Sequence, residues 1–472
     1  MLRKKYFVIS IVFLFISVSF VSVPSIANQT IDDNENPQLL NIGVTSYDII
    51  IPDEHPTIQE GVNNANPGDA IYVRHGVYKE SVLIKKHGLI LQGENKYNTI
   101  IDGSFSTDDG ILIDAENVTI QGFTITNFIS SYKTFWDQAG IKVYQPNATI
   151  KNNRLIENRW GIEIYSLAYN ATVIDNELIN DGISLGNYFN HMNYPNLTKQ
   201  DFLHNIDNNT VNGLPLYYCV NKDDFSVPTD IGQIILVNCT NVTIKNLYLT
   251  RSDFAIILAY CNDCLIENNT ISDTEGEVLF YVCENNTIQN NTITKTFKAI
   301  CLEFKSKNNI VRYNYCCNNI CGISVFLSAT NNIVYENIAN NNEQFGIEII
   351  SCHGGIQRNN TILKNQVHNN HVGIFLAENC VDNKIHKNSI KKNDIGIYLT
   401  KSSDNNFIES NNFKVNLIPA IFIGCNKNHW YNNYWNRPRI SPKTIIGLRP
   451  LGKILVPWFN FDMKPALKPY EI

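Results

Sequence analysis

The sequence predicts an all-β fold: a single-stranded, right-handed parallel β-helix with a short N-terminal capping helix and an aromatic C-terminal cap. Three observations predict it: repeats spaced by 22 or 23 residues, two short apolar-polar alternating runs in each repeat, and asparagine or glycine at the ends of these runs. Such runs are typical of strands with one buried face. Because each solenoid unit packs on its neighbours, a chain of 472 residues needs no division into several globular domains.

The first repeat unit reads roughly Asn-x-Thr-Ile-x-Asn-Asn-x-Ile. Its central aliphatic residues are Ile120, Ile150, Val173, Ile244, Ile266, Ile288, Val311, Val334, Ile385 and Ile408. Near Gln357 the unit recurs with one residue of slip, which divides the gap of 51 residues before Ile385 into 23 and then 28. An asparagine follows three residues after most of these positions. Asparagine tolerates the left-handed conformation of a tight corner, and its amide can bond its stacked equivalents, so we expect an asparagine ladder. The expected members are Asn153, Asn176, Asn269, Asn291, Asn314, Asn337, Asn360, Asn388 and Asn411.

The second repeat unit resembles Gly-Ile-x-Ile and supplies one outward position in each coil. That outward row is predicted to run Leu112, Lys142, Glu163, Ser184, Ile235, Ile257, Phe280, Cys301, Ser324, Glu348, Phe375, Tyr398 and Phe422. Lys142 and Ser184 flank Glu163, so no pair of carboxylates is expected there. Apolar side chains on an outer face need a cover. We expect the aromatic C-terminal tail to fold back over the last three members of the row.

The chain is predicted to divide into a signal peptide (residues 1–27), a linker (28–48), a β-helix (49–425) and a capping tail (426–472). The β-helix carries two insertions, 127–138 and 186–230. The signal peptide has a basic start, an uncharged apolar run from Tyr6 to Phe20 and a small-residue cleavage site ending at Ala27. That run is short for a membrane span, and no later stretch is long and apolar enough to cross a bilayer. We therefore expect an extracytoplasmic protein, secreted or at the cell surface.

The ends of the solenoid also have predicted structures. Residues 57–60 form a capping-box sequence, and Ile58, Val62 and Ala65 share one face of the short helix that would follow. At the other end, the aromatic residues that can cover the last coil are Trp430, Tyr431, Tyr434, Trp435, Trp458, Phe459 and Phe461. The net charge of −6 and the lack of long basic runs argue against nucleic acid and anionic lipid as partners.

All 12 cysteines lie between Cys219 and Cys425. Cys239, Cys261 and Cys283 are 22 residues apart, in a slot that alanine and serine fill in other coils. A slot that accepts small residues of any chemistry is typical of an inward stack, so we interpret these cysteines as buried structural thiols. Disulfides and a metal site remain alternatives.

Residues 57–103 contain Gly-Asp-Ala-Ile-Tyr-Val at 68–73, Gly-Val-Tyr-Lys-Glu at 76–80, Leu-Gln-Gly-Glu at 91–94 and Ile-Asp-Gly at 101–103. This segment resembles the opening of NosD-type proteins of the pectin-lyase-like superfamily, also described as carbohydrate-binding and sugar-hydrolase (CASH) domains. With the asparagine-rich coils the resemblance covers about residues 49–425, and residues 212–218 and 433–435 resemble exported archaeal and bacterial members. The resemblance implies the fold specifically and the activity weakly, because one scaffold hosts many functions.

The resemblance implies a possible copper site, because NosD-type proteins are associated with copper supply to a reductase. The residues that would hold it are Cys352, His353, His368 and His371, whose thiolate and imidazole groups suit copper. The alternative is that these four are polar corner residues that fall near one another in the sequence by chance.

Catalytic motifs of related enzymes are missing from the sequence, including those of pectin methylesterases, polygalacturonases and epimerases of this fold. Insertions on a rigid solenoid often form its working face. The aromatic and acidic residues in or beside the two insertions are Tyr132, Trp136, Asp137, Trp160, Tyr165 and Tyr188. They favour binding of a polysaccharide or glycan without catalysis. A lyase or hydrolase with an unrecognised site, a copper-delivery protein and a structural surface rod stay open as alternatives.

Overall fold

Left-handed corner residues close the short strands into coils. Asn152, Asp175, Asn268 and Asn290 have φ between 51° and 58°, and each directly precedes an asparagine of the predicted ladder. Asparagine and aspartate adopt this conformation more readily than other residues with a Cβ. The expectation that the ladder asparagine itself is left-handed was therefore wrong by one residue. The side chain of the ladder residue turns into the coil, and the residue before it turns the chain.

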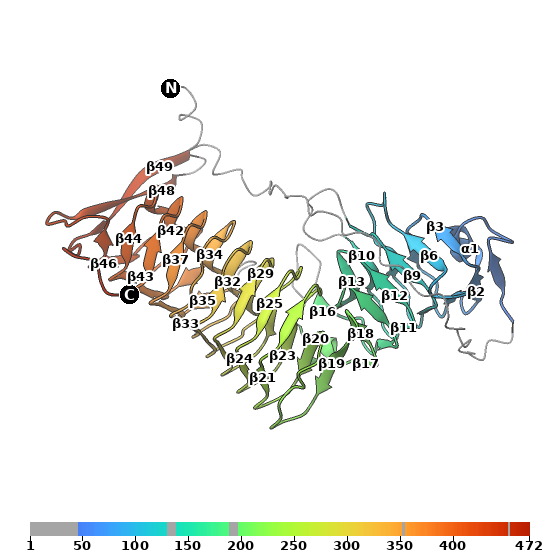
Figure 1. Cartoon of the computed structure of the whole chain (residues 1–472). Helices are drawn as coiled ribbons and strands as arrows, with labels where there is room; N and C mark the ends of the chain where they lie inside the picture. The colour runs from blue at the N-terminus through green and yellow to red at the C-terminus, as the bar shows by residue number, and fades with distance from the viewer. Residues whose placement is uncertain (1–45, 130–137, 188–196, 352–354, 452–453) are drawn as a thin grey trace, which may run out of the picture.

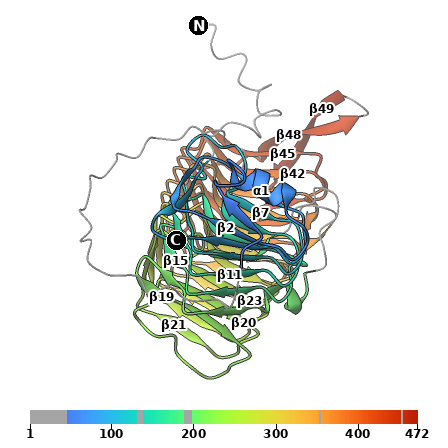
Figure 2. The same cartoon turned by 90° about the vertical axis from the view of Figure 1, so that its right-hand side faces the viewer.

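The computed structural model describes residues 46–129, 138–187, 197–351, 355–451 and 454–472. It confirms the predicted parallel β-helix, with about 16 turns. Figure 1 shows that the coils form two stacks that meet at an angle, so the solenoid is bent. We call residues 46–211 the first arm and residues 214–472 the second arm. Viewed nearly end-on in Figure 2, the coils of each arm lie behind one another.

Three ladders of parallel strands build the first arm. Ladder A contains β1 (Ile49–Ile51), β2 (Ala70–Val73), β5 (Ile90–Gly93), β8 (Thr119–Gln121), β11 (Thr149–Lys151), β14 (Thr172–Ile174) and β17 (Asn205–Asp207). Ladder B contains β3 (Gly76–Tyr78), β6 (Thr99–Asp102), β9 (Thr124–Thr126), β12 (Arg154–Ile156), β15 (Glu177–Ile179) and β18 (Thr210–Val211). Ladder C contains β4 (Val82–Ile84), β7 (Ile111–Ile113), β10 (Ala139–Val143), β13 (Trp160–Tyr165) and β16 (Ile183–Asn187).

The second arm repeats this arrangement over more coils. Ladder D contains β19 (Leu214–Val220), β20 (Gln233–Val237), β23 (Ile256–Ala259), β26 (Val278–Tyr281), β29 (Lys298–Glu303), β32 (Cys321–Phe326), β34 (Phe345–Ile350), β38 (Val372–Ala377), β42 (Ile395–Thr400), β45 (Ile418–Ile423) and β48 (Lys443–Leu451). Ladder E contains β21 (Thr243–Lys245), β24 (Leu265–Glu267), β27 (Thr287–Gln289), β30 (Ile310–Arg312), β33 (Ile333–Tyr335), β36 (Thr361–Leu363), β40 (Lys384–His386), β43 (Phe407–Glu409) and β46 (His429–Tyr431). Ladder F contains β22 (Tyr248–Thr250), β25 (Thr270–Ser272), β28 (Thr292–Thr294), β31 (Tyr315–Cys316), β37 (Gln366–His368), β41 (Ser389–Lys391), β44 (Asn412–Lys414) and β47 (Tyr434–Trp435). A short pair, β35 (Gln357–Arg358) and β39 (Cys380–Val381), lies beside them.

Buried asparagines run along the second arm in three lines. Asn337 is typical: its Nδ2 donates to the carbonyl of Val311 at 2.9 Å and to Oδ1 of Asn365 at 3.0 Å, while its Oδ1 accepts from the backbone N–H and Nδ2 of Asn314. Each amide thus satisfies backbone groups that a corner leaves unpaired. The three lines are Asn269, Asn291, Asn314, Asn337, Asn365, Asn388, Asn411 and Asn433; Asn286, Asn309, Asn332, Asn360, Asn383, Asn406 and Asn428; and Asn319, Asn342, Asn370, Asn393 and Asn416.

The predicted asparagine ladder is confirmed, with one exchange of members. Asn365 occupies the rung that the sequence assigned to Asn360, which belongs to the second line. The reason is that Ile362, and not Gln357, pairs with Val334 in ladder E. The longer coil therefore precedes the shorter one, in the order 28 and then 23 residues.

Glycine and cysteine permit close stacking inside the coils. A Cβ on Gly322 would lie 2.4 Å from the carbonyl oxygen of Gly346, so this coil requires glycine at that position. Cys239, Cys261 and Cys283 are buried in the core of the second arm, which confirms the predicted inward stack. All 11 described cysteines are buried free thiols.

A tight turn produces the bend. β18 and β19 pair antiparallel across Asn212 and Gly213, whose φ values of 52° and 78° suit the type I′ turn that an Asn-Gly pair favours. β19 then pairs in parallel with β20 and begins ladder D. The outer face of ladder D therefore starts against the outer face of ladder C, where the two arms meet.

The N-terminal end has the predicted capping helix, α1 (Ile58–Asn64). The Thr57 hydroxyl accepts from the N–H of Glu60, and Ile58, Val62 and Ala65 are buried. The Glu80 carboxylate accepts from two further N–H groups of the first turn at 2.9 Å each. A negative charge is favoured at a helix N-terminus.

The C-terminal segment extends the solenoid instead of folding back over it. β48 adds to ladder D beside β45, and β49 (Ile454–Asp462) returns antiparallel to β48. Trp430 and Trp435 are buried, and Trp435 stacks on Phe413 at 4.2 Å, as a cap requires. Tyr431, Trp458, Phe459 and Phe461 are exposed, so the predicted aromatic cover uses only part of the tail.

The predicted outward row slips by one residue in two coils. Leu279 and Ile421 face outward, and Phe280 and Phe422 lie in the core. Both errors occur where two large apolar residues are adjacent, so alternation gives no preference for either register. No helix among the described residues is long and apolar enough to cross a membrane.

Candidate functional site at the bend

Apolar packing and a few hydrogen bonds hold the two arms together. Ile235, Ile257 and Leu279, on the outer face of ladder D, belong to the same hydrophobic cluster as the core of the first arm. Trp160 of β13 stacks on Phe254 with ring centroids 5.3 Å apart. The bend is thus a packed junction, and the outer faces of ladders C and D open away from it on its inner side (Figure 1).

Polar contacts fix the junction further. The side chain of Gln233 accepts from the N–H of Ile183 at 2.9 Å and donates to its carbonyl at 2.8 Å, as a neighbouring strand would. Phe202, in the short 3-10 helix η2 (Lys199–Phe202), packs on Tyr260 and Tyr281. Side chains therefore hold the two arms together in addition to the backbone pairing of β18 with β19.

A charged cluster lies on the outer face of the first arm. The Lys142 ammonium is 2.8 Å from Asp109 and 3.4 Å from Glu163, and it lies 5.9 Å from the ring centroid of Tyr165. Tyr144 packs edge-on against Tyr165 at 4.6 Å. We call these five residues the first-arm cluster. Burial lowers the pKa of Lys142, but the nearby carboxylates outweigh it and raise that pKa above its usual value.

A second cluster lies on the outer face of ladder D. It contains Glu277, Lys298, Cys301, Glu303 and Glu348, which we call the second-arm cluster. Lys298 Nζ is 3.5 Å from Glu348 and 4.0 Å from Cys301 Sγ, and Cys301 Sγ is 3.3 Å from Glu303. All five are almost fully buried, apart from the partly exposed end of Lys298.

The second-arm cluster holds more carboxyl groups than one lysine can neutralise. Burial raises the pKa of Glu277 to about 8, although Lys298 opposes the shift. Burial likewise raises the pKa of Glu303. A carboxyl group with such a pKa is protonated near neutral pH and can donate as well as accept a hydrogen bond.

Tyr281 connects the two clusters electrostatically. Its ring lies between Phe202 and Phe304, with centroids 5.1 and 5.6 Å away. Burial raises the pKa of its hydroxyl, and the charges of Glu303 and Glu277 in the second arm and of Glu163 in the first raise it further. Lysine, carboxyl and phenol groups from both arms therefore gather on the inner side of the bend. This combination can bind the hydroxyl and carboxyl groups of a sugar and can transfer protons.

Glu277, Cys301 and Glu303 also form the one group of possible metal ligands among the described residues, with ligand atoms within 4.8 Å of one another. The Lys298 ammonium next to Cys301 already supplies a positive charge there. Burial raises the pKa of the Cys301 thiol, which opposes the thiolate that a metal needs. The group does not suit a metal ion well.

The predicted glycan-binding residues are partly brought together. Trp160 and Tyr165 both lie in β13 at the bend, one at the junction and one in the first-arm cluster. Tyr165 is buried and Trp160 half-buried, so neither offers a fully open ring face. Tyr132, Trp136, Asp137 and Tyr188 lie outside the described residues.

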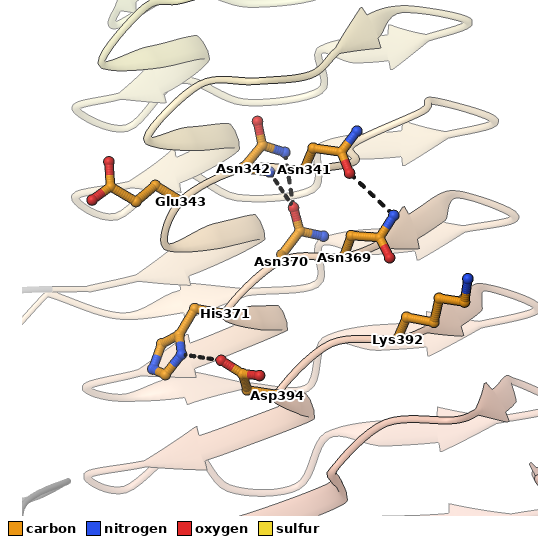
Figure 3. Close-up of a pocket in the computed structure, with 8 residues that line it drawn as sticks. All are labelled: Asn341, Asn342, Glu343, Asn369, Asn370, His371, Lys392 and Asp394. Carbon is orange, nitrogen blue, oxygen red and sulfur yellow. Dashed lines mark hydrogen bonds and ion pairs between the residues drawn. The ribbon is translucent and has the colours of Figure 1, made fainter. Parts of the chain in front are cut away.

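The two predicted copper ligands that the structure describes, His368 and His371, lie away from the bend, on the second arm. Cys352 and His353 are outside the described residues, while His368 Nε2 is 2.9 Å from the Ser389 hydroxyl. His371 is paired with Asp394 at 2.8 Å and lines a shallow groove of about 460 Å³ (Figure 3). The rest of the groove is formed by Asn341, Asn342, Glu343, Asn369, Asn370 and Lys392. The two histidines thus have separate partners, and copper binding stays a prediction.

Sequence reasoning missed the second-arm cluster. A signal was present, because the outward row carries Cys301, Ser324 and Glu348 in three successive coils. The pairing of Lys142 with Glu163 and of Glu163 with Ser184 is as predicted, and Asp109 was not foreseen. The sequence of the outward row does not reveal the bend. The bend turns the part of the row on ladder C toward the part on ladder D.

A comparison with protein-family profiles agrees with the fold. The sequence profile of the family described as "Right handed beta helix region" matches residues 204–339, 232–390 and 335–438. Among solved structures, the A-module of mannuronan C-5 epimerase AlgE6 from Azotobacter vinelandii has 13% identity and a TM-score of 0.37, covering 79% of this chain and 90% of that chain. A variant of the periplasmic alginate epimerase AlgG has 12% identity and a TM-score of 0.38, over 77% and 78% of the chains. The Dettilon tailspike protein has 14% identity and a TM-score of 0.35, over 81% and 68%.

A search of curated proteins gives no match. The chain is a right-handed parallel β-helix protein, as predicted. Its resemblance to NosD-type proteins in particular stays a prediction.

Proposed function

We propose that this protein is an exported or cell-surface protein that binds a polysaccharide on the inner side of the bend, between the first-arm and second-arm clusters. One observation carries the proposal: five charged side chains lie at outer-face positions of ladders C and D, on either side of the bend, and are largely buried there. They are Lys142, Glu163, Lys298, Glu303 and Glu348. Buried ion pairs contribute little net stability, so charges in this number indicate a binding surface more than a structural need.

The chemistry of the clusters suits a sugar chain. Carboxylates accept hydrogen bonds from sugar hydroxyls, and the two lysines donate to hydroxyl or carboxyl oxygens. Tyr144, at the rim of the first-arm cluster, and Phe326, whose ring centroid is 4.5 Å from Lys298 Nζ, add aromatic surface beside the charges. The predicted N-terminal signal peptide supports this proposal, because it would export the chain to where polysaccharides occur.

The test is binding of the purified full-length chain to a glycan array. Lys298→Met and Lys142→Met each remove the only lysine of one cluster, and Lys295→Met is the matched control. Lys295 lies three residues from Lys298 but is exposed and paired with Asp273. We expect each cluster variant to lower the affinity for any bound glycan at least about tenfold, a loss of about 1.4 kcal/mol, with no change in the control. Unchanged binding by both cluster variants, with β-sheet circular dichroism intact, would contradict this site.

Proton transfer on the bound glycan is a second candidate function. It is favoured by Glu277, whose pKa of about 8 keeps it protonated near neutral pH beside Lys298 and Cys301. A carboxyl with a raised pKa is a common general acid. The check is to incubate the chain with each glycan it binds and to follow new reducing ends and ultraviolet-absorbing unsaturated products. Glu277→Gln should abolish any turnover and keep binding, and a lack of products from every bound glycan would leave binding as the function.

A further inference from the structure

We propose that the hairpin of β48 and β49 docks this protein on an anionic lipid surface. Its nine-residue strands pair antiparallel from Lys443↔Asp462 to Leu451↔Ile454. The hairpin projects from the C-terminal end of the second arm, well beyond the outline of the coils (Figure 2). It is independent of the proposed glycan site at the bend.

One face of this hairpin is apolar and about half exposed. Opposed residues of an antiparallel pair lie on the same face, which here joins Ile446 with Phe459, Leu448 with Pro457, and Thr444 with Phe461. Ile446 is 60% exposed, and Phe459 and Phe461 are each 49% exposed. A two-stranded ribbon is marginally stable in water by itself. Exposed apolar side chains that lie together on one face of such a ribbon therefore indicate that this face binds to another surface.

The apolar face continues the outer face of the second arm. Ile446 pairs with Ile421 and Leu448 with Ile423, so the hairpin extends the outward row that includes Phe375 and Tyr398. Near the end of the hairpin, Leu451 and Ile454 are also more than half exposed. The most protruding described residues are thus apolar on both faces.

Charge identifies the surface that would cover it. Residues 437–468 hold seven lysines or arginines and one aspartate, a net charge of +6, so the remainder of the chain carries −12. None of the ion pairs between described residues involves this segment. Arg449 Cζ lies 4.9 Å from the centroid of the Trp458 ring, and Trp458 is 41% exposed. The overall acidity that argued against anionic lipid conceals this local basic segment.

A basic, aromatic and apolar projection fits the interface of a membrane with anionic headgroups. Aromatic side chains favour the headgroup level, and nearby lysines and arginines are attracted to an anionic leaflet. A symmetric pair of hairpins would bring two net charges of +6 together, which disfavours a second copy as the occupant. Cations are already crowded in this segment. Burial lowers the pKa of Lys443, and repulsion from Arg439 and Arg437 lowers it further.

The experiment measures co-sedimentation of the full-length chain with phosphatidylcholine vesicles that contain no phosphatidylglycerol or about a third of it. Ile446→Ser/Phe459→Ser removes the apolar face, and Arg437→Gln/Arg439→Gln removes two of the cations. The matched control is Tyr248→Ser, which replaces an aromatic residue of β22 that is 66% exposed. All chains keep the same N-terminal residues, so lipid binding by the apolar run 6–20 is equal in each. Sheet content and thermal midpoints verify that the variants fold.

Two results are expected. The parent chain and the Tyr248→Ser control bind the anionic vesicles at least about tenfold better than either hairpin variant, and salt weakens the binding. Trp458 fluorescence, taken as the difference from Trp458→Phe, shifts to shorter wavelength on anionic vesicles and loses acrylamide quenching.

Three results would overturn the proposal. The first is equal sedimentation of the parent chain and the hairpin variants. The second is a lipid-free dimer that Ile446→Ser/Phe459→Ser dissociates, which would make a second copy the occupant. The third is an unchanged Trp458 emission and quenching on anionic vesicles that sediment the chain, which would mean that another part of the chain holds the lipid.

Discussion

Asp253 in the second arm accepts a hydrogen bond from the backbone N–H of Gly161 in the first arm at 2.8 Å, across 92 residues of sequence. Asp181 is close enough that its charge acts on Asp253. Burial and this neighbour raise the pKa of Asp253 well above its usual value, and burial raises the pKa of Asp181 to about 8. The junction thus contains two aspartates that are protonated in the folded protein near neutral pH.

Stability should therefore fall as the pH rises from about 4 to about 8. In this window the folded chain binds more protons than the unfolded chain, whose aspartates ionise near pH 4, and a rise in pH then favours unfolding. Asp181→Asn should remove much of this dependence and raise stability above pH 8 by on the order of 2 kcal/mol. An asparagine Oδ1 can accept both donors of Asn158, as Asn176 does for Asn153. Urea unfolding at pH 5, 7 and 9 measures this, with the exposed Asp224→Asn as control. Identical pH profiles for Asp181→Asn and the parent chain would contradict it.

Removing one rung of an asparagine line should destabilise the second arm. Asn337→Ala leaves the carbonyl of Val311 and the backbone N–H of Asn314 without their partners. Buried unsatisfied groups of this kind should cost about 2 to 4 kcal/mol in total. The control Asn331→Gly changes an exposed left-handed corner residue and should cost less than about 0.5 kcal/mol. Urea unfolding compares the two, and a loss in Asn337→Ala no larger than in the control would refute the role of the line.

The cysteines should behave as buried thiols in the purified protein. A thiol reagent such as Ellman's reagent should leave the 11 described cysteines of the native chain unmodified and should react with them after denaturation. Reductant should not change the thermal midpoint, because no disulfide joins the described residues. A drop in the midpoint on reduction would show that disulfides form in the mature protein.

Lys142→Met should destabilise the first arm, since it leaves Glu163 buried without its cation. Breaking a buried pair in this way typically costs about 3 to 5 kcal/mol. Lys85→Met, an exposed lysine of the same arm, is the control and should cost less than about 0.5 kcal/mol. If the two variants melt alike in circular dichroism, the first-arm cluster contributes nothing to folding. The glycan assay with Lys142→Met is therefore run below the melting temperature of the variant.

The repeat predicted the fold because the same physical constraint recurs in every coil. Asn291, Asn314 and Asn337 stand at equal spacing, and one arrangement satisfies all of them. The bend depends on a single turn at Asn212 and Gly213, which periodicity cannot reveal. From the sequence we interpreted this pair only as part of a family resemblance over residues 212–218. An Asn-Gly pair is nevertheless a strong signal for a hairpin turn.

The candidate site was harder to predict, because its members meet across the bend. Glu163 and Tyr281 are far apart in sequence, and a one-dimensional repeat places each residue only beside its equivalents in adjacent coils. Lys142 and Glu163 were predicted neighbours within one arm, as found. The register slip at Leu279 hid the outward face of β26, where Tyr281 lies.

The asparagine lines have a direction, which bears on how this solenoid can change its length. Within a line, the bonds from one asparagine to the next run toward the C-terminus, as from Asn337 Nδ2 to Asn365 Oδ1. The first line ends at Asp462, whose carboxylate accepts from Asn433 and from Trp435 Nε1. A terminal acceptor needs no donor beyond it, so any number of whole coils can precede it. Between Asn337 and Asn365 one coil has 28 residues instead of 23, yet all three lines pass it unbroken. Duplication or loss of a coil, and enlargement of its loops, are therefore changes that evolution or an engineer can make without redesigning either end.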